Sequence, residues 1–184
     1  MKPEVKCLSE NYNGLDSPPL NTAFFDIETD FDASRGFADP SDPFMPITAI
    51  SVHLQWLDLL VTLVIPPKSM REGEGLIEAQ RICDQFDNTQ LYLNEGDMLN
   101  DFMDVIEDAD VLTGWNSEGY DIPYTINRIT KVLSKSHTRK LCLWDLYPQK
   151  RKIIKYGKEQ ETFDLFGRIH LDYLELYRKY TYHE

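Results

Sequence analysis

Hydrophobic positions change their spacing along this chain, and each spacing indicates a different kind of element. Residues 22–29, Thr-Ala-Phe-Phe-Asp-Ile-Glu-Thr, are apolar, aromatic and β-branched, so they predict a buried strand that carries two acids. A loop rich in Asp, Gly, Ser and Pro follows, and then two strand-like runs, 47–55 and 57–65, are joined by a tight turn. These segments predict a β-meander.

Helical spacing is clearest after residue 94. Asn94, with Asp97 three residues on, is typical of a helix start. Apolar side chains then recur at i, i+3, i+4 and i+7, at Leu99, Phe102, Met103 and Ile106. A short helix over about 77–86 and a short strand at 90–93 are predicted before it.

The remaining pattern completes an α/β domain. It predicts a strand over 110–114, a helix with Pro123 in its first turn, a hairpin over 150–165, and a last helix capped by Asp172 and Glu175 that ends near Tyr180. This order implies a mixed β-sheet with helices packed on it. Residues 1–21 show neither the strand period of 2 nor the helix period of 3.6, so they are interpreted as a tail or linker. Residues 22–184 are then one domain.

Composition limits the function classes. With 184 residues, 42% of them hydrophobic, the chain can bury one ordinary core. The formal net charge of −12 should repel a phosphate backbone unless cations or a basic neighbouring domain intervene. The longest apolar run, 57–67, is far shorter than the ~20 residues of a membrane span, so no membrane partner is expected. Three cysteines in no paired pattern fit a reducing cytoplasm.

Two acids lie in the first predicted strand. Asp26 and Glu28 are two residues apart, so they project from the same face of the strand. Neighbouring carboxylates repel each other unless a cation lies between them, and Mg²⁺ prefers such oxygen ligands. Taken alone, the Asp-x-Glu pattern still favours a solvated strand end over a metal site.

A second candidate segment spans residues 112–128. It places Asp121 in a strand-to-helix turn beside a helix N-terminus, which attracts carboxylates and phosphates. A simple helix cap before Pro123 explains Asp121 equally well. It does not explain the rest of the segment.

The two segments together resemble a known family. Phe24-Phe-Asp-Ile-Glu-Thr29 resembles the first exonuclease motif of family B DNA polymerases, and Gly114-Trp-Asn with Tyr120-Asp-Ile-Pro-Tyr and Arg128 resembles the second. The stretches 162–168 and 171–177 resemble the T-even phage type of these enzymes. The similarity spans roughly residue 23 to the C-terminus.

The resemblance implies an RNase H-like fold and proofreading of single-stranded DNA 3′ ends by two Mg²⁺ or Mn²⁺ ions. It assigns Asp26 to both ions, Glu28 to the ion that activates water, and Asp121 to the second ion. It also implies substrate contacts for Thr29, Asn116 and Tyr120. Core packing is an equally good explanation of Tyr120.

The chain departs from the family pattern in two places. Many members have Asn where this chain has Gly119. The third motif, Tyr-x-x-x-Asp, does not follow the second, so we expect a C-terminally incomplete exonuclease fold without a polymerase active site. The expected partners are a DNA 3′ end and the rest of a polymerase: the third motif, palm, fingers and thumb. If the chain is phage-encoded, it should act in the host cytoplasm.

Several spacings mimic the missing motif. Tyr12–Asp16 precedes the first motif, and Tyr180–Glu184 has the wrong acid at a terminus. His53–Asp58 is predicted to lie at the turn between two strands, and Asp172 to cap a helix.

Three functions remain open. The favoured one is the proofreading exonuclease domain of a DNA polymerase. The others are a stand-alone RNase H-like nuclease on RNA or short DNA, and a non-catalytic scaffold domain of the same fold.

Overall fold

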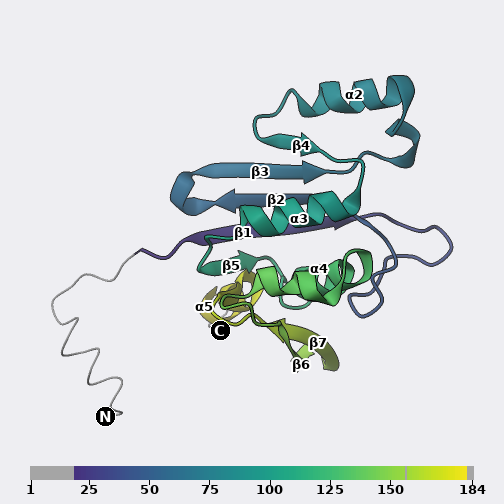
Figure 1. Ribbon diagram of the computed structural model, residues 1–184. Coiled ribbons are helices and arrows are strands. Elements are labelled where there is room, and N and C mark those ends of the chain that lie inside the picture. Colours follow the sequence, from purple (N-terminus) through teal and green to yellow (C-terminus); the bar gives the residue numbers. More distant parts are fainter. Residues whose placement is uncertain (1–18, 156, 182–184) are drawn as a thin grey trace, which may run out of the picture.

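A six-stranded mixed sheet forms the centre of the molecule (Figure 1). The structure is a computed structural model that describes residues 19–155 and 157–181. Across the sheet, the strands are β4 (Thr89–Leu91), β3 (Leu59–Val64), β2 (Ile47–Leu54), β1 (Thr22–Thr29), β5 (Val111–Gly114) and β8 (Ile169–Asp172). The pairs β1–β2 and β2–β3 are antiparallel, whereas β3–β4, β1–β5 and β5–β8 are parallel.

Helices pack on this sheet and at its ends. They are α2 (Gly73–Cys83), α3 (Glu95–Val105), α4 (Asp121–Val132) and α5 (Tyr173–Thr181), with 3-10 turns η1 (Gln55–Leu57), η2 (Lys68–Met70) and η3 (Lys135–Leu141). Figure 1 shows α3 and α4 lying across one face of the sheet. The alternation of β1 explains this, because Phe25 and Ile27 point to that face and are buried there. The ring of Phe25 lies 5.8 Å from that of Phe102 on α3.

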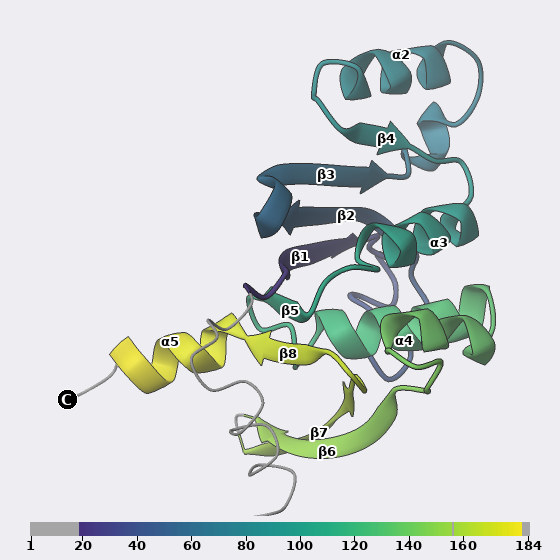
Figure 2. The ribbon, with the colours of Figure 1, turned by 60° about the vertical axis from the view of Figure 1, so that its left-hand side comes forward.

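A second, two-stranded sheet lies beside α4 (Figure 2). It is the predicted hairpin, made of β6 (Gln149–Lys155) and β7 (Lys158–Asp164) in antiparallel register. Figure 2 shows α5 extending from the end of β8, on the other side of the sheet from α3 and α4.

The expected mixed α/β fold, RNase H-like with helices on a mixed sheet, is confirmed. The predicted helix start at Asn94 is also confirmed, because its side chain accepts a hydrogen bond from the Gly96 N–H at 2.7 Å. Strand β8 was not predicted. It has only four residues and pairs in parallel with a strand more than 50 residues away, so no local pattern indicates it.

The predicted tail lies largely outside the described residues, which begin at position 19. Asn21 is anchored, because its backbone N–H donates to the Asp110 carboxylate at 2.8 Å. The spacing Tyr12–Asp16 and the acid of Tyr180–Glu184 also lie outside this range. Among the described helices, none is long and apolar enough to cross a membrane.

Candidate active site

The two acids of β1 lie on the face of the sheet opposite α3 and α4. Asp26 and Glu28 are exposed, whereas Phe25 and Ile27 are buried on the helix side. The strand alternation therefore places both carboxylates on one face, as their spacing predicts.

The third acid is brought to β1 by the neighbouring strand β5. The two strands are parallel, with Phe24 opposite Thr113, so their carboxyl ends meet at one edge of the sheet. Gly114 permits this approach, because a Cβ atom there would lie 2.5 Å from the Phe25 carbonyl oxygen. The chain then turns and begins α4 at Asp121.

Asp121 is buried against the backbone of β1. It is only 4% exposed, and its Oδ1 accepts a hydrogen bond from the Ile27 N–H at 3.2 Å, between the two acids of β1. Burial first, and then the charge of Asp26, raise the pKa of Asp121 to about 7. The carboxylate therefore lies in a place where its negative charge is unfavourable without a cation.

The donor chemistry of these acids fits a hard divalent cation, which binds through carboxylate oxygens. A nearby cation would also relieve the effect that raises the pKa of Asp121. However, in the part of the chain that the structure describes, no three His, Cys, Asp or Glu side chains form a ready-made metal site.

The candidate substrate residues on β1 and before α4 lie together. Thr29 Oγ1 and the Tyr120 hydroxyl are 3.3 Å apart. The Tyr120 ring stacks on Tyr124 at 5.3 Å, and Tyr120 packs against the hydrophobic core. Tyr120 is thus part of the core while its hydroxyl reaches the edge of the site.

The third candidate, Asn116, contacts a residue that sequence reasoning missed. Its backbone has φ of 57°, in the left-handed region where Asn is favoured, and its Oδ1 accepts a hydrogen bond from Lys155 Nζ at 3.3 Å. Lys155 closes β6 and is only 5% exposed. Its ammonium group lies 2.6 Å from Asp172 Oδ2. No sequence signal marks this lysine as buried.

Asp172 caps α5 as predicted, because its Oδ1 accepts a hydrogen bond from the Leu174 N–H at 3.0 Å. Glu175 pairs with Arg178 and lies near Lys155. The turn placement of His53 and Asp58 is also confirmed, since the two side chains meet between β2 and β3.

Arg128, the last residue of the second motif, has a structural role in this domain. Its guanidinium forms two hydrogen bonds with the Glu95 carboxylate, at 2.7 and 2.6 Å, and both side chains are largely buried. Arg128 also donates to the Pro43 carbonyl, and Glu95 accepts from the Ile47 N–H. The pair therefore joins α4, α3 and the segment before β2.

An apolar groove of about 400 Å³ lies beside Asp26 on the open face of the sheet. Its lining includes Asp26, Phe24, His53, Leu60, Trp115 and Tyr173. Trp115 is half exposed, and its ring lies 6.1 Å from that of Tyr173 and 5.7 Å from that of Tyr177. The groove offers flat aromatic surfaces next to a carboxylate.

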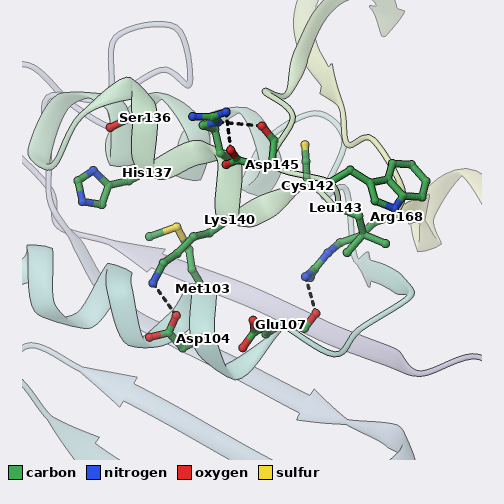
Figure 3. A pocket seen from close by; sticks show the side chains of 12 residues that line it. Met103, Asp104, Glu107, Ser136, His137, Lys140, Cys142, Leu143, Asp145 and Arg168 are labelled. Atoms are coloured by element: carbon green, nitrogen blue, oxygen red, sulfur yellow. Dashed lines mark hydrogen bonds and ion pairs between the residues drawn. The ribbon is translucent and has the colours of Figure 1, made fainter.

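A separate cavity of about 450 Å³ lies between α3 and η3 (Figure 3). Its cationic groups already have partners: Lys140 pairs with Asp104, and Arg168 donates to the carbonyls of Ile106 and Glu107. Figure 3 shows these contacts crossing the cavity toward α3. Arg168 caps the C-terminal end of α3. The charged side chains of this cavity therefore have a structural role, and they do not indicate a ligand site.

Comparison with known proteins gives a consistent result. The sequence model of the family described as "DNA polymerase family B, exonuclease domain" matches residues 1–184. The DNA-directed DNA polymerase of Escherichia phage RB69 is 29% identical over 95% of this chain and 21% of its own length. The DNA-directed DNA polymerase of Enterobacteria phage T4 is 34% identical over 48% of this chain and 10% of its own.

A herpesvirus relative matches a smaller share of this chain than the RB69 enzyme does. The DNA polymerase catalytic subunit of Saimiriine herpesvirus 2 (strain 11) is 28% identical over 62% of the chain and 11% of its own length. The chain thus spans about a fifth or less of these curated relatives.

Proposed function

This chain belongs to the exonuclease domain family of the family B DNA polymerases, and we propose that it hydrolyses the 3′-terminal phosphodiester of single-stranded DNA in the 3′→5′ direction. The observation that carries the proposal is the position of Asp121. Its buried carboxylate lies on the Ile27 N–H, between Asp26 and Glu28, and its pKa is raised to about 7. Carboxylates on and beside one strand are suited to holding cations at a phosphodiester.

The family generally uses divalent metals, and we assign the binding of two Mg²⁺ or Mn²⁺ ions to Asp26, Glu28 and Asp121. When bound, such ions lower the pKa of the attacking water and stabilise the departing 3′ oxygen. The exposed carboxylates of Asp26 and Glu28 lie where solvent and substrate reach them. The Ile27 N–H fixes the orientation of the Asp121 carboxylate.

The surroundings of the acids suit a single strand. The groove beside Asp26 presents Phe24, Trp115 and Tyr173, and bases stack on aromatic side chains with little dependence on sequence. Thr29 and Tyr120, whose hydroxyl oxygens are 3.3 Å apart, are assigned to the terminal nucleotide. The charge of −12 weakens binding to DNA, so we assign the basic contacts to the remainder of a polymerase.

The test is release of the 3′-terminal nucleoside monophosphate from a single strand that is labelled in that nucleotide. It compares the chain alone with the chain joined to a segment that carries a Tyr-x-x-x-Asp motif. Because that motif supplies a further acid in the family, we expect the joined chain to be at least 10–100-fold more active. Asp26→Ala should abolish the activity, and Asp87→Ala, at an exposed acid on a turn far along the chain from the site, should leave it unchanged.

Two results would contradict the proposal. One is activity of the joined chain that survives Asp26→Ala. The other is a joined chain that folds but releases no monophosphate. An RNA strand of the same sequence, degraded faster than DNA, would instead favour a nuclease that contacts the 2′-OH.

A further inference from the structure

A lysine of the hairpin is buried next to the candidate nucleotide site. Lys155 Nζ lies 2.6 Å from Asp172 Oδ2 and 3.7 Å from Glu175 Oε1, and the side chains of Lys155 and Asp172 are 5% and 4% exposed. Burying an ammonium group is costly unless it is paired, so these carboxylates fix the lysine in place. The hairpin is thereby attached to the start of α5.

The third contact of the ammonium group orients a candidate substrate residue. Lys155 Nζ lies 3.3 Å from Asn116 Oδ1. An ammonium group has donors only, so the amide oxygen of Asn116 must face it and the amide nitrogen must point elsewhere. The Asn116 NH₂ group is therefore left to donate to another acceptor.

Gly119 provides the space for this arrangement. A Cβ atom at position 119 would lie 2.9 Å from Asn116 Oδ1, 3.3 Å from Lys155 Cδ and 3.4 Å from Lys155 Nζ. The first distance is shorter than real Cβ contacts, and the others are tight. Side chains at 119 and at 155 therefore compete for one volume, beside the amide of Asn116.

We propose that Lys155 and Gly119 form a matched pair that positions the Asn116 amide for the 3′-terminal nucleotide. Lys155 is a positioning residue in this scheme: it fills the volume above Gly119 and holds the Asn116 oxygen, so that the NH₂ group faces the nucleotide. The nucleotide part rests on the proposed exonuclease function. The steric match of the two residues does not.

The proposal also links the hairpin to the site. Lys155 is the last residue of β6, at the tip of the hairpin, and Arg151 on the same face of β6 pairs with Glu118 of the β5–α4 loop. Both contacts join the hairpin to the loop that carries Asn116. Displacement of the hairpin would therefore release the Asn116 amide.

The steric match is tested by a double-mutant cycle of Gly119→Ala and Lys155→Ala, read by thermal unfolding. Gly119→Ala should lower Tm by about 5 °C in the wild-type background, since overpacking is destabilising. The loss should be less than half as large in the Lys155→Ala background, where the competing Lys155 atoms are absent and the lysine no longer holds the Asn116 amide against position 119. Equal losses in both backgrounds would overturn the match.

The positioning role is tested by NMR and by binding of dTMP in the presence of MgCl₂. In Lys155→Ala the side-chain NH₂ signals of Asn116 should shift, and the Kd for dTMP should rise about tenfold, the effect of one lost hydrogen bond. Lys152→Ala, an exposed lysine of the same strand, should change neither. If Lys155→Ala does not fold, Gly119→Ala is used instead, because it presses on the same amide.

Unshifted Asn116 signals or an unchanged Kd for dTMP would overturn the positioning role. A wild-type chain that binds no dTMP would contradict the exonuclease proposal and the nucleotide contact of Asn116. The unfolding cycle would still decide the match of Lys155 with Gly119, so the two failures are distinguishable.

Discussion

The β5–α4 loop, which carries Asn116 and leads to Asp121, is held differently on its two sides. On the α4 side, Tyr124 and Ile129 are buried in the core, and Arg128 forms a buried pair with Glu95. On the hairpin side, the contacts are ion pairs: Lys155 with Asp172, and the half-exposed Arg151 with Glu118.

The difference separates two tasks. The α4 side fixes the Asp121 carboxylate against β1 through burial and the hydrogen bond from the Ile27 N–H, and salt screens such buried contacts little. The hairpin side depends on charge pairs, and the exposed ones among them are screened by salt. Asp121 is thus placed by packing, whereas the Asn116 side of the loop is held by electrostatic contacts that can change.

The largest expected effect on stability comes from Arg128→Met, which removes the buried ion pair with Glu95 on the α4 side. The Glu95 carboxylate would then be buried without its partner, which costs about 3–5 kcal/mol of unfolding free energy. Urea unfolding would measure the loss. Arg81→Met removes an exposed pair with Glu78 and should change the free energy of unfolding far less, because solvent screens that pair. A loss below 1 kcal/mol for Arg128→Met would show that burial alone holds this side.

A second effect on the α4 side should depend on pH. Burial raises the pKa of Asp121 from an ordinary value of 3.8 to about 7, so the folded state holds a proton that the unfolded state has released. Stability from this group is therefore lost as pH rises from about 4 to about 7, by roughly 3 kcal/mol in all. Asp121→Asn removes the charge and keeps an acceptor for the Ile27 N–H.

The measurement is the free energy of unfolding of Asp121→Asn and the parent chain, in EDTA, at pH 4.5 and pH 8. The substitution should stabilise the chain by about 3 kcal/mol more at pH 8 than at pH 4.5. Asp87→Asn, at an exposed acid on a turn, is the control and should show no such difference. If the effect of Asp121→Asn does not depend on pH, the pKa of Asp121 is not raised in the folded chain, and the prediction is wrong.

The contrast between the two sides of the loop also explains which features could be predicted from the sequence. Alternation along β1 predicts that Asp26 and Glu28 share a face, and the apolar period and start signal of α3 predict its position; both agree with the structure. These features depend on local spacing. The pairing of β1 with β5, which brings Asp121 to the Ile27 N–H, depends on tertiary structure, and the sequence indicates a shared site for these acids only through the family resemblance.

The hairpin side could not be predicted in this way. In β6 the order Ile153, Ile154, Lys155 favours exposure of the lysine, yet Ile154 is 81% exposed and Lys155 is buried. Strand alternation requires that 153 and 155 share a face, but it does not say which face is buried. That choice is made by the carboxylate of Asp172, which is the last residue of an unpredicted four-residue strand.

The smallest expected effect tests whether the hairpin side is electrostatic. Arg151 lies between Glu118 and Asp164, and its side chain is more than a third exposed, so solvent screens both pairs. Arg151→Met should therefore cost only about 0.5–1 kcal/mol at low salt. The loss should shrink further at 1 M NaCl, where the Debye length falls to about 3 Å.

Lys68→Met, another basic surface residue, is the matched control, because no ion pair of this residue with a described partner is found. A loss for Arg151→Met that is as large in high salt as in low salt would mean that the methylene groups of Arg151, packed on the hairpin, hold this side of the loop. The contrast between the two sides would then be one of degree, because packing would anchor both.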